Sequence, residues 1–213
     1  MNPLFKNIKI IAWDVDTTLY KNIPELSLKF KEECIKVVAA VRNISYKEAE
    51  NIFEDMRLKC GSSTMALRTL KAGDEKTLLE IQKKLHKQDY IKPDPKLLEM
   101  FNKLKKFRHF IITNSMKEDD QACLKKLGIA ETIFEKIITV EDSGEPKPGL
   151  ASFQLLLTTT GLSADQHVYI GDREQVDIVP AKSLGMKTIL VWGKSDIADL
   201  SLPTVYDVAN VFI

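Results

Sequence analysis

The chain has 213 residues, a formal net charge of +1, 44% hydrophobic residues and 29% charged residues. These values are typical of a water-soluble globular protein, and the balanced charge excludes a global attraction to nucleic acid or to an anionic membrane. No apolar run approaches the ~20 residues of a membrane span, and the N-terminus lacks the apolar core of a signal peptide, so we expect a cytoplasmic protein.

The first predicted element is a buried strand at residues 8–13, IKIIAW, because the run is short, β-branched and aromatic. Two acids, Asp14 and Asp16, and two threonines, Thr17 and Thr18, follow it directly. One interpretation of this stretch is a solvated turn after a strand. The other is a nucleophile that works with a metal ion, and the rest of the chain has to decide between them.

Residues 20–92 carry helical patterns and no convincing strand. Ser45 and Glu48 have the spacing of a capping box at the start of a helix, and Asp74 is placed to cap a later one. Pro95, after the break at KPDP, fits the first turn of a further helix. We therefore predict an all-helical insert after the first strand.

Strands and helices alternate from residue 107 onward. Strands are predicted at 107–114, 135–140, 167–172 and 186–192, helices at 119–128, 150–161 and 175–185, and a last short strand within 201–213. Such alternation implies a parallel sheet covered by helices on both faces. The expected fold is therefore α/β, with a core domain of residues 1–19 and 93–213 and a helical domain of residues 20–92.

Polar side chains follow the carboxyl ends of four predicted strands, where the working residues of open α/β sheets gather. In chain order they are Asp14 and Asp16, then Thr113, Asn114 and Ser115, then Lys147, and finally Asp172 and Asp177. Taken singly, each could be an ordinary turn or cap residue. Together they bring carboxylates, one amine and several hydroxyls to one edge of the sheet.

This combination has a chemical logic. Crowded carboxylates raise one another's pKa, and a divalent cation removes that penalty. Carboxylate, carbonyl and water oxygens suit octahedral Mg²⁺. A carboxylate can attack phosphorus to form an acyl phosphate, while a lysine and Mg²⁺ neutralise the phosphoryl oxygens.

The stretches DVDTT (14–18), TNS (113–115), Lys147 and GDREQVD (171–177) resemble, in the same order, the four motifs of the haloacid dehalogenase-like phosphatase superfamily. The resemblance extends from residue 8 to about residue 193. It implies a Rossmann-like core, a helical cap formed by residues 20–92, Mg²⁺ as cofactor and hydrolysis through a phosphorylated aspartate.

The resemblance also assigns a role to each matching position. Asp14 would be the nucleophile and an Mg²⁺ ligand, and Asp16 the general acid and then base, with its carbonyl facing the metal. Thr113 and the backbone amide of Asn114 would bind the phosphate, Lys147 would hold nucleophile and phosphate, Asp172 would ligate Mg²⁺, and Asp177 would order metal-bound water or Lys147. Dehalogenating members lack an acid at the place of Asp16, so its presence favours phosphate chemistry.

The substrate is less defined by the sequence. CGSSTMALRTL (60–70) and GDREQVDIVPAKSLGM (171–186) resemble more loosely the pyrimidine 5′-nucleotidases, in which the segment matching Gly61–Thr64 often lies over the site. We therefore expect a small phosphorylated metabolite, with a nucleoside 5′-monophosphate as one candidate, and neither a nucleic acid polymer nor a membrane as partner. The alternatives are a sugar-phosphate phosphomutase and a binding or regulatory protein that keeps the fold without turnover.

Two positions depart from the family pattern. Thr17 stands where the family usually has Gly or Asn, which tolerate left-handed backbone better than a β-branched residue. We therefore expect either a negative φ at Thr17 or a shifted loop. Val176 stands where the nucleotidase branch often has Asn, so one polar support of the metal site is expected to be absent.

Overall fold

The computed structural model describes residues 2–60 and 63–213, and the chain separates into two compact units. Unit 1 comprises residues 1–22 and 91–213, and unit 2 comprises residues 23–90. Gly61 and Ser62, part of the segment expected to lie over the site, fall outside the described residues.

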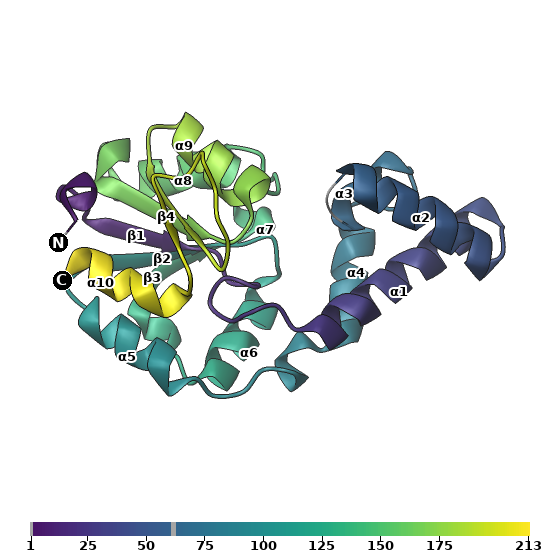
Figure 1. The fold of residues 1–213 in the computed structure, drawn as a ribbon, viewed down its shortest axis with the longest axis horizontal. Coiled ribbons are helices and arrows are strands. Elements are labelled where there is room, and N and C mark those ends of the chain that lie inside the picture. The colour runs from purple at the N-terminus through teal and green to yellow at the C-terminus, as the bar shows by residue number, and fades with distance from the viewer. Residues whose placement is uncertain (1, 61–62) are drawn as a thin grey trace. The chain divides into compact units, whose positions relative to one another are not determined.

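Unit 1 is built on a six-stranded parallel sheet with the order β3-β2-β1-β4-β5-β6 (Figure 1). The strands are β1 (Ile10–Trp13), β2 (Arg108–Ile112), β3 (Phe134–Ile138), β4 (His167–Gly171), β5 (Lys187–Val191) and β6 (Leu200–Leu202). The order reverses between β1 and β4, so the crevice outside their carboxyl ends is where an open α/β sheet binds its ligand. The predicted α/β class is confirmed.

Helices cover both faces of this sheet, with α8 and α9 on one face and α5, α6 and α10 on the other (Figure 1). The helices of unit 1 are α5 (Pro95–Lys103), α6 (Lys117–Leu127), α7 (Val140–Ser143), α8 (Ala151–Thr160), α9 (Val179–Ser183) and α10 (Val208–Phe212). Short 3₁₀ turns lie at Pro3–Phe5, Glu131–Ile133, Ala164–Gln166 and Val205–Asp207.

The central strand β1 is fully buried, and its side chains alternate between the two layers. Ile10 and Ala12 belong to the hydrophobic cluster that includes Phe153 of α8. Trp13 instead packs on Phe101 of α5, with ring centroids 5.1 Å apart. Because both faces of β1 are packed, the loop after it starts from a rigid point.

In the described part of unit 2 the α-helices are α1 (Pro24–Arg42), α2 (Tyr46–Cys60), α3 (Ser63–Thr69) and α4 (Glu75–Leu85), and a 3₁₀ turn lies at Lys87–Asp89. The predicted capping box is present, because Ser45 N–H donates to Glu48 at 3.0 Å and Glu48 N–H donates to Ser45 at 3.3 Å. Asp74 caps α4 as expected. Across 2–60 and 63–213, no helix is long and apolar enough to cross a bilayer.

Two segments differ from the sequence prediction. The single helix expected at 175–185 is a π turn (Glu174–Ile178) followed by α9, with Val179 N–H donating to the carbonyl of Glu174. Pro180 lacks the backbone N–H that an unbroken α-helix would need there. The strand expected within 201–213 ends at Leu202, and the apolar run VANVF is buried as α10 instead.

Candidate active site

Asp14 follows β1 directly and is only 2% exposed. Its backbone N–H donates to the carbonyl of Ile170 in β4 at 2.9 Å, which fixes it at the reversal point of the sheet. Its Oδ1 accepts from Lys147 Nζ at 2.8 Å, and its Oδ2 accepts from Thr18 Oγ1 at 2.9 Å. Burial raises the pKa of Asp14, and the Lys147 charge acts in the opposite direction. The carboxyl group of Asp14 is therefore fixed by two hydrogen bonds and lies beside the ammonium group of Lys147.

Lys147 is buried, and its ammonium group donates to three acceptors. Nζ lies 2.8 Å from Asp14 Oδ1, 2.8 Å from Asp177 Oδ1 and 2.7 Å from the Tyr169 hydroxyl. These contacts use all three ammonium hydrogens. Burial alone would lower the pKa of Lys147, but the two carboxylates outweigh it and raise the pKa, so the amine stays charged.

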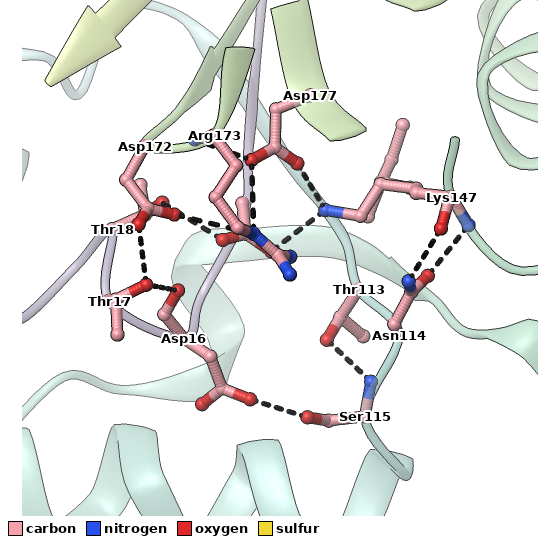
Figure 2. A network of polar contacts seen from close by, with 12 residues as sticks. Asp16, Thr17, Thr18, Thr113, Asn114, Ser115, Lys147, Asp172, Arg173 and Asp177 are labelled. Carbon is pink, nitrogen blue, oxygen red and sulfur yellow. Dashed lines mark hydrogen bonds and ion pairs between the residues drawn. The ribbon is translucent and has the colours of Figure 1, made fainter. Parts of the chain in front are cut away.

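Asn114 holds the backbone of Lys147 from two sides (Figure 2). Its side-chain nitrogen donates to the Lys147 carbonyl at 2.9 Å, and its Oδ1 accepts from the Lys147 N–H at 2.8 Å. Thr113 is 2% exposed, and its hydroxyl oxygen accepts from the Ser115 N–H at 3.0 Å. The expected phosphate-binding stretch is thus a tight turn that also sets the position of Lys147.

The segment after β4 brings two further acids to the same place. A Cβ at Gly171 would lie 2.4 Å from the Cβ of Asp177, so only glycine lets that carboxylate pack against the strand. Asp177 is fully buried and accepts from the Arg173 N–H at 3.1 Å as well as from Lys147. Asp172 lies nearer solvent, and its Oδ1 accepts from Thr18 at 3.2 Å.

Thr17 has a φ of 63°, in the left-handed region, which excludes the first of the two expected alternatives. A β-branched residue is disfavoured there. The structure shows what offsets the strain: Thr17 Oγ1 lies 2.6 Å from the Asp16 carbonyl and 2.7 Å from Asp172 Oδ2. The expected negative φ is therefore wrong, since the hydrogen bond to Asp172, far away in the sequence, overrides the local preference. The shifted loop stays a prediction.

Asp16 points to a different set of partners from Asp14. Its Oδ1 accepts from the Tyr20 hydroxyl at 2.6 Å, and its Oδ2 accepts from the Ser115 hydroxyl at 2.6 Å. Burial, and then the Asp16 charge, raise the pKa of Tyr20, so its phenol stays protonated and donates. The two acids of the first loop therefore have distinct environments.

The carboxylates of Asp14, Asp172 and Asp177 form a cluster whose oxygens lie within 4.8 Å of one another. Burial, and then repulsion from Asp14, raises the pKa of Asp172 to about 6. Such a shift is expected where acids crowd together without enough positive charge. An oxygen-preferring divalent cation would supply that charge, so the residues present fit Mg²⁺.

Three residues of the site were not singled out from the sequence. Arg173 Nε lies 3.9 Å from Asp172 Oδ1 and 3.8 Å from Asp177 Oδ2. Its position directly after Asp172 is the sequence feature that indicates a place in the site. Tyr20 stands in the mixed stretch TTLYKNI and Tyr169 in the strand HVYIG, and neither stretch marks their hydroxyls as partners of Asp16 and Lys147.

The raised pKa of Asp172 predicts a pH effect in metal-free protein. A carboxyl whose pKa rises from 3.8 to about 6 binds its proton more tightly in the folded chain, so stability falls as pH rises through that window. In EDTA at neutral pH we expect Asp172→Asn to melt about 3 °C above the wild type, because the buried charge is removed. The difference should vanish at acid pH. Melting curves that show no gain at neutral pH contradict this.

The model of the Haloacid dehalogenase-like hydrolase family matches residues 11–191, a range that includes all four motifs. The glyceraldehyde 3-phosphate phosphatase of Methanocaldococcus jannaschii is 31% identical over 194 residues, which cover 86% of this chain and 85% of that protein.

Two solved structures share the fold. A HAD phosphatase from Thermococcus onnurineus has a TM-score of 0.67 and 21% identity, covering 96% of this chain and 97% of that one. The putative HAD-hydrolase YfnB from Bacillus subtilis, bound to magnesium, has a TM-score of 0.65 and 17% identity, covering 98% of this chain and 100% of that one.

Proposed function

Because this chain belongs to the haloacid dehalogenase-like hydrolase family and is a phosphatase of it, we propose that it hydrolyses a small phosphate monoester through a phospho-aspartate on Asp14. The observation that carries the proposal is that two carboxylates of one loop have different partners. Asp14 is held by Lys147 and Thr18, whereas Asp16 is held by Tyr20 and Ser115. Two carboxylates in different environments suit two roles, a nucleophile and a proton carrier.

In the proposed reaction an Asp14 oxygen attacks phosphorus while the bond to the leaving alcohol breaks. Asp16 gives its proton to that alcohol. Asp16 then takes a proton from the water that attacks the acyl phosphate, and the bond between Asp14 and phosphorus breaks to release inorganic phosphate. Lys147 holds Asp14 in place for both steps and balances charge on the phosphoryl group.

Mg²⁺ is proposed to bind through Asp14, Asp172 and the carbonyl of Asp16, where it would neutralise phosphoryl oxygens during transfer. Asp177 keeps Lys147 in place, since one of its oxygens accepts from that amine. Residues 20–92 are proposed as a cap that selects the substrate.

The name of the relative from M. jannaschii makes glyceraldehyde 3-phosphate the first candidate substrate, and the looser nucleotidase resemblance makes a nucleoside 5′-monophosphate the second. A panel of both classes, with phosphoglycolate and p-nitrophenyl phosphate, should be assayed for phosphate release with Mg²⁺ and with EDTA. We expect turnover that requires Mg²⁺. Tight ligand binding without turnover of any ester would instead favour a non-catalytic protein, and isomerised hexose 1-phosphate would favour a phosphomutase.

The contacts of Asp16 give a test of its role. Tyr20→Phe should lower kcat about tenfold with little change in KM, because Asp16 loses one of the hydrogen bonds that position it but keeps its carboxyl group. The loss should be larger with an alkyl phosphate than with p-nitrophenyl phosphate, whose leaving group needs less protonation. Equal losses on both substrates would contradict the role of Tyr20 in positioning Asp16. Tyr46→Phe removes a phenol hydroxyl from the exposed surface of unit 2 and serves as the control.

A further inference from the structure

Thr17 is a residue of the site to which the proposed chemistry assigns no role. Its Oγ1 lies between two oxygens that come from different elements, the carbonyl of Asp16 at 2.6 Å and Oδ2 of Asp172 at 2.7 Å (Figure 2). In the proposed function, which this inference rests on, both of these oxygens ligate Mg²⁺. The side chain therefore bridges two intended ligands of the cation.

The distances indicate what the hydroxyl does there. In an octahedron with arms of about 2.1 Å, neighbouring ligand oxygens lie about 3 Å apart. The two contacts of Thr17 are shorter than this and match hydrogen bonds from a hydroxyl. The hydroxyl has a single hydrogen for two acceptors, so it shares that hydrogen between them. The group is thus placed as a hydrogen-bond donor, and not at the spacing of a further ligand.

The backbone gives this side chain its position. With φ at 63°, the loop has the left-handed conformation that glycine adopts without strain, and a glycine would leave both oxygens uncovered. Threonine adopts the same conformation and adds a hydroxyl over them. The positive φ of Thr17 and the two contacts of its hydroxyl therefore indicate that the side chain acts on these two oxygens.

We propose that the Thr17 hydroxyl is an internal competitor of the cation. In the metal-free protein it holds the Asp16 carbonyl and Asp172 in place. Mg²⁺ binds only when the hydroxyl releases these two oxygens, so Thr17 lowers the affinity for Mg²⁺. The site is then half-filled at a higher Mg²⁺ concentration than it would be if the Thr17 hydroxyl were absent.

The matched pair Thr17→Ser and Thr17→Ala isolates the hydroxyl, because both variants lack the β-branch and differ only in that group. Calorimetric titration with MgCl₂ alone, without substrate, measures the affinity directly. We expect the serine variant to bind within about twofold of the wild type and the alanine variant to bind about tenfold more tightly, the effect of one hydrogen bond to a charged group. Thr17→Gly, which suits the positive φ, should also bind more tightly.

Equal affinities of the serine and alanine variants, or weaker binding by alanine and glycine, would overturn the inference. The proposed function would survive that result, because the wild type would still bind Mg²⁺ and release phosphate. A wild type that binds no Mg²⁺ and releases no phosphate would overturn both. Melting curves in EDTA confirm that each variant is folded.

Discussion

Asp14→Asn is expected to abolish phosphate release from p-nitrophenyl phosphate, with a loss of about ten-thousand-fold or more, the scale seen when a nucleophile is removed. The amide has nearly the shape of the carboxylate: its oxygen can still accept from Lys147, and its NH2 group can donate to the Thr18 hydroxyl oxygen, but it is a poor nucleophile. The fold should survive, because Lys147 keeps the buried carboxylate of Asp177 as its ion-pair partner. Initial rates with saturating Mg²⁺ and a melting curve measure both effects.

The matched control is Glu118→Gln, an acid-to-amide change at an exposed position of α6. It should leave the rate and the melting temperature unchanged. Retention of full activity by Asp14→Asn would contradict the proposed nucleophile. Loss of activity together with loss of the fold would contradict the claim that its amide preserves the site.

Lys147→Met is expected to have the second largest effect, on both stability and rate. Methionine fills the buried space but removes the ion-pair partner of Asp14 and leaves Asp177 with Arg173 alone. Breaking a buried ion pair from one side costs about 3–5 kcal/mol. The rate should also fall, because Asp14 is no longer held. Chemical denaturation measures the free energy of unfolding, and initial rates measure the second effect.

A double variant separates these two roles of Lys147. Lys147→Met with Asp177→Asn removes one of the stranded charges, so it should recover part of the lost stability. It should recover none of the activity, because the group that holds Asp14 is still missing. Recovery of activity in the double variant, or full stability of Lys147→Met alone, would contradict the assigned contacts.

The architecture could be predicted because its signals are local. Strand and helix patterns alternate along residues 107–192, and parallel strands align their carboxyl ends, so the sequence placed Asp14, Lys147 and Asp172 near one another. The π turn before Pro180 and the helix at 208–212 depend on packing against the sheet, which the pattern of a single segment does not contain.

The details of the site depend on contacts between distant segments. Thr17 is separated by 155 positions from Asp172, the partner that offsets its strained φ. The sequence predicts Tyr169 to be an ordinary core residue of β4, but in the structure its hydroxyl accepts a hydrogen bond from Lys147. Local propensity gives the wrong φ at Thr17 because a hydrogen bond to Asp172, at the end of another strand, stabilises the disfavoured conformation.

The most direct test of the central claim is to trap the phospho-aspartate. Asp16→Asn should slow hydrolysis of the intermediate more than its formation from p-nitrophenyl phosphate, whose leaving group needs little protonation. After acid quenching during turnover, mass spectrometry should find one added phosphoryl group on the peptide that contains Asp14. A phosphoryl group on another residue, or unmodified Asp14 in a variant that is still turning over, would contradict the account.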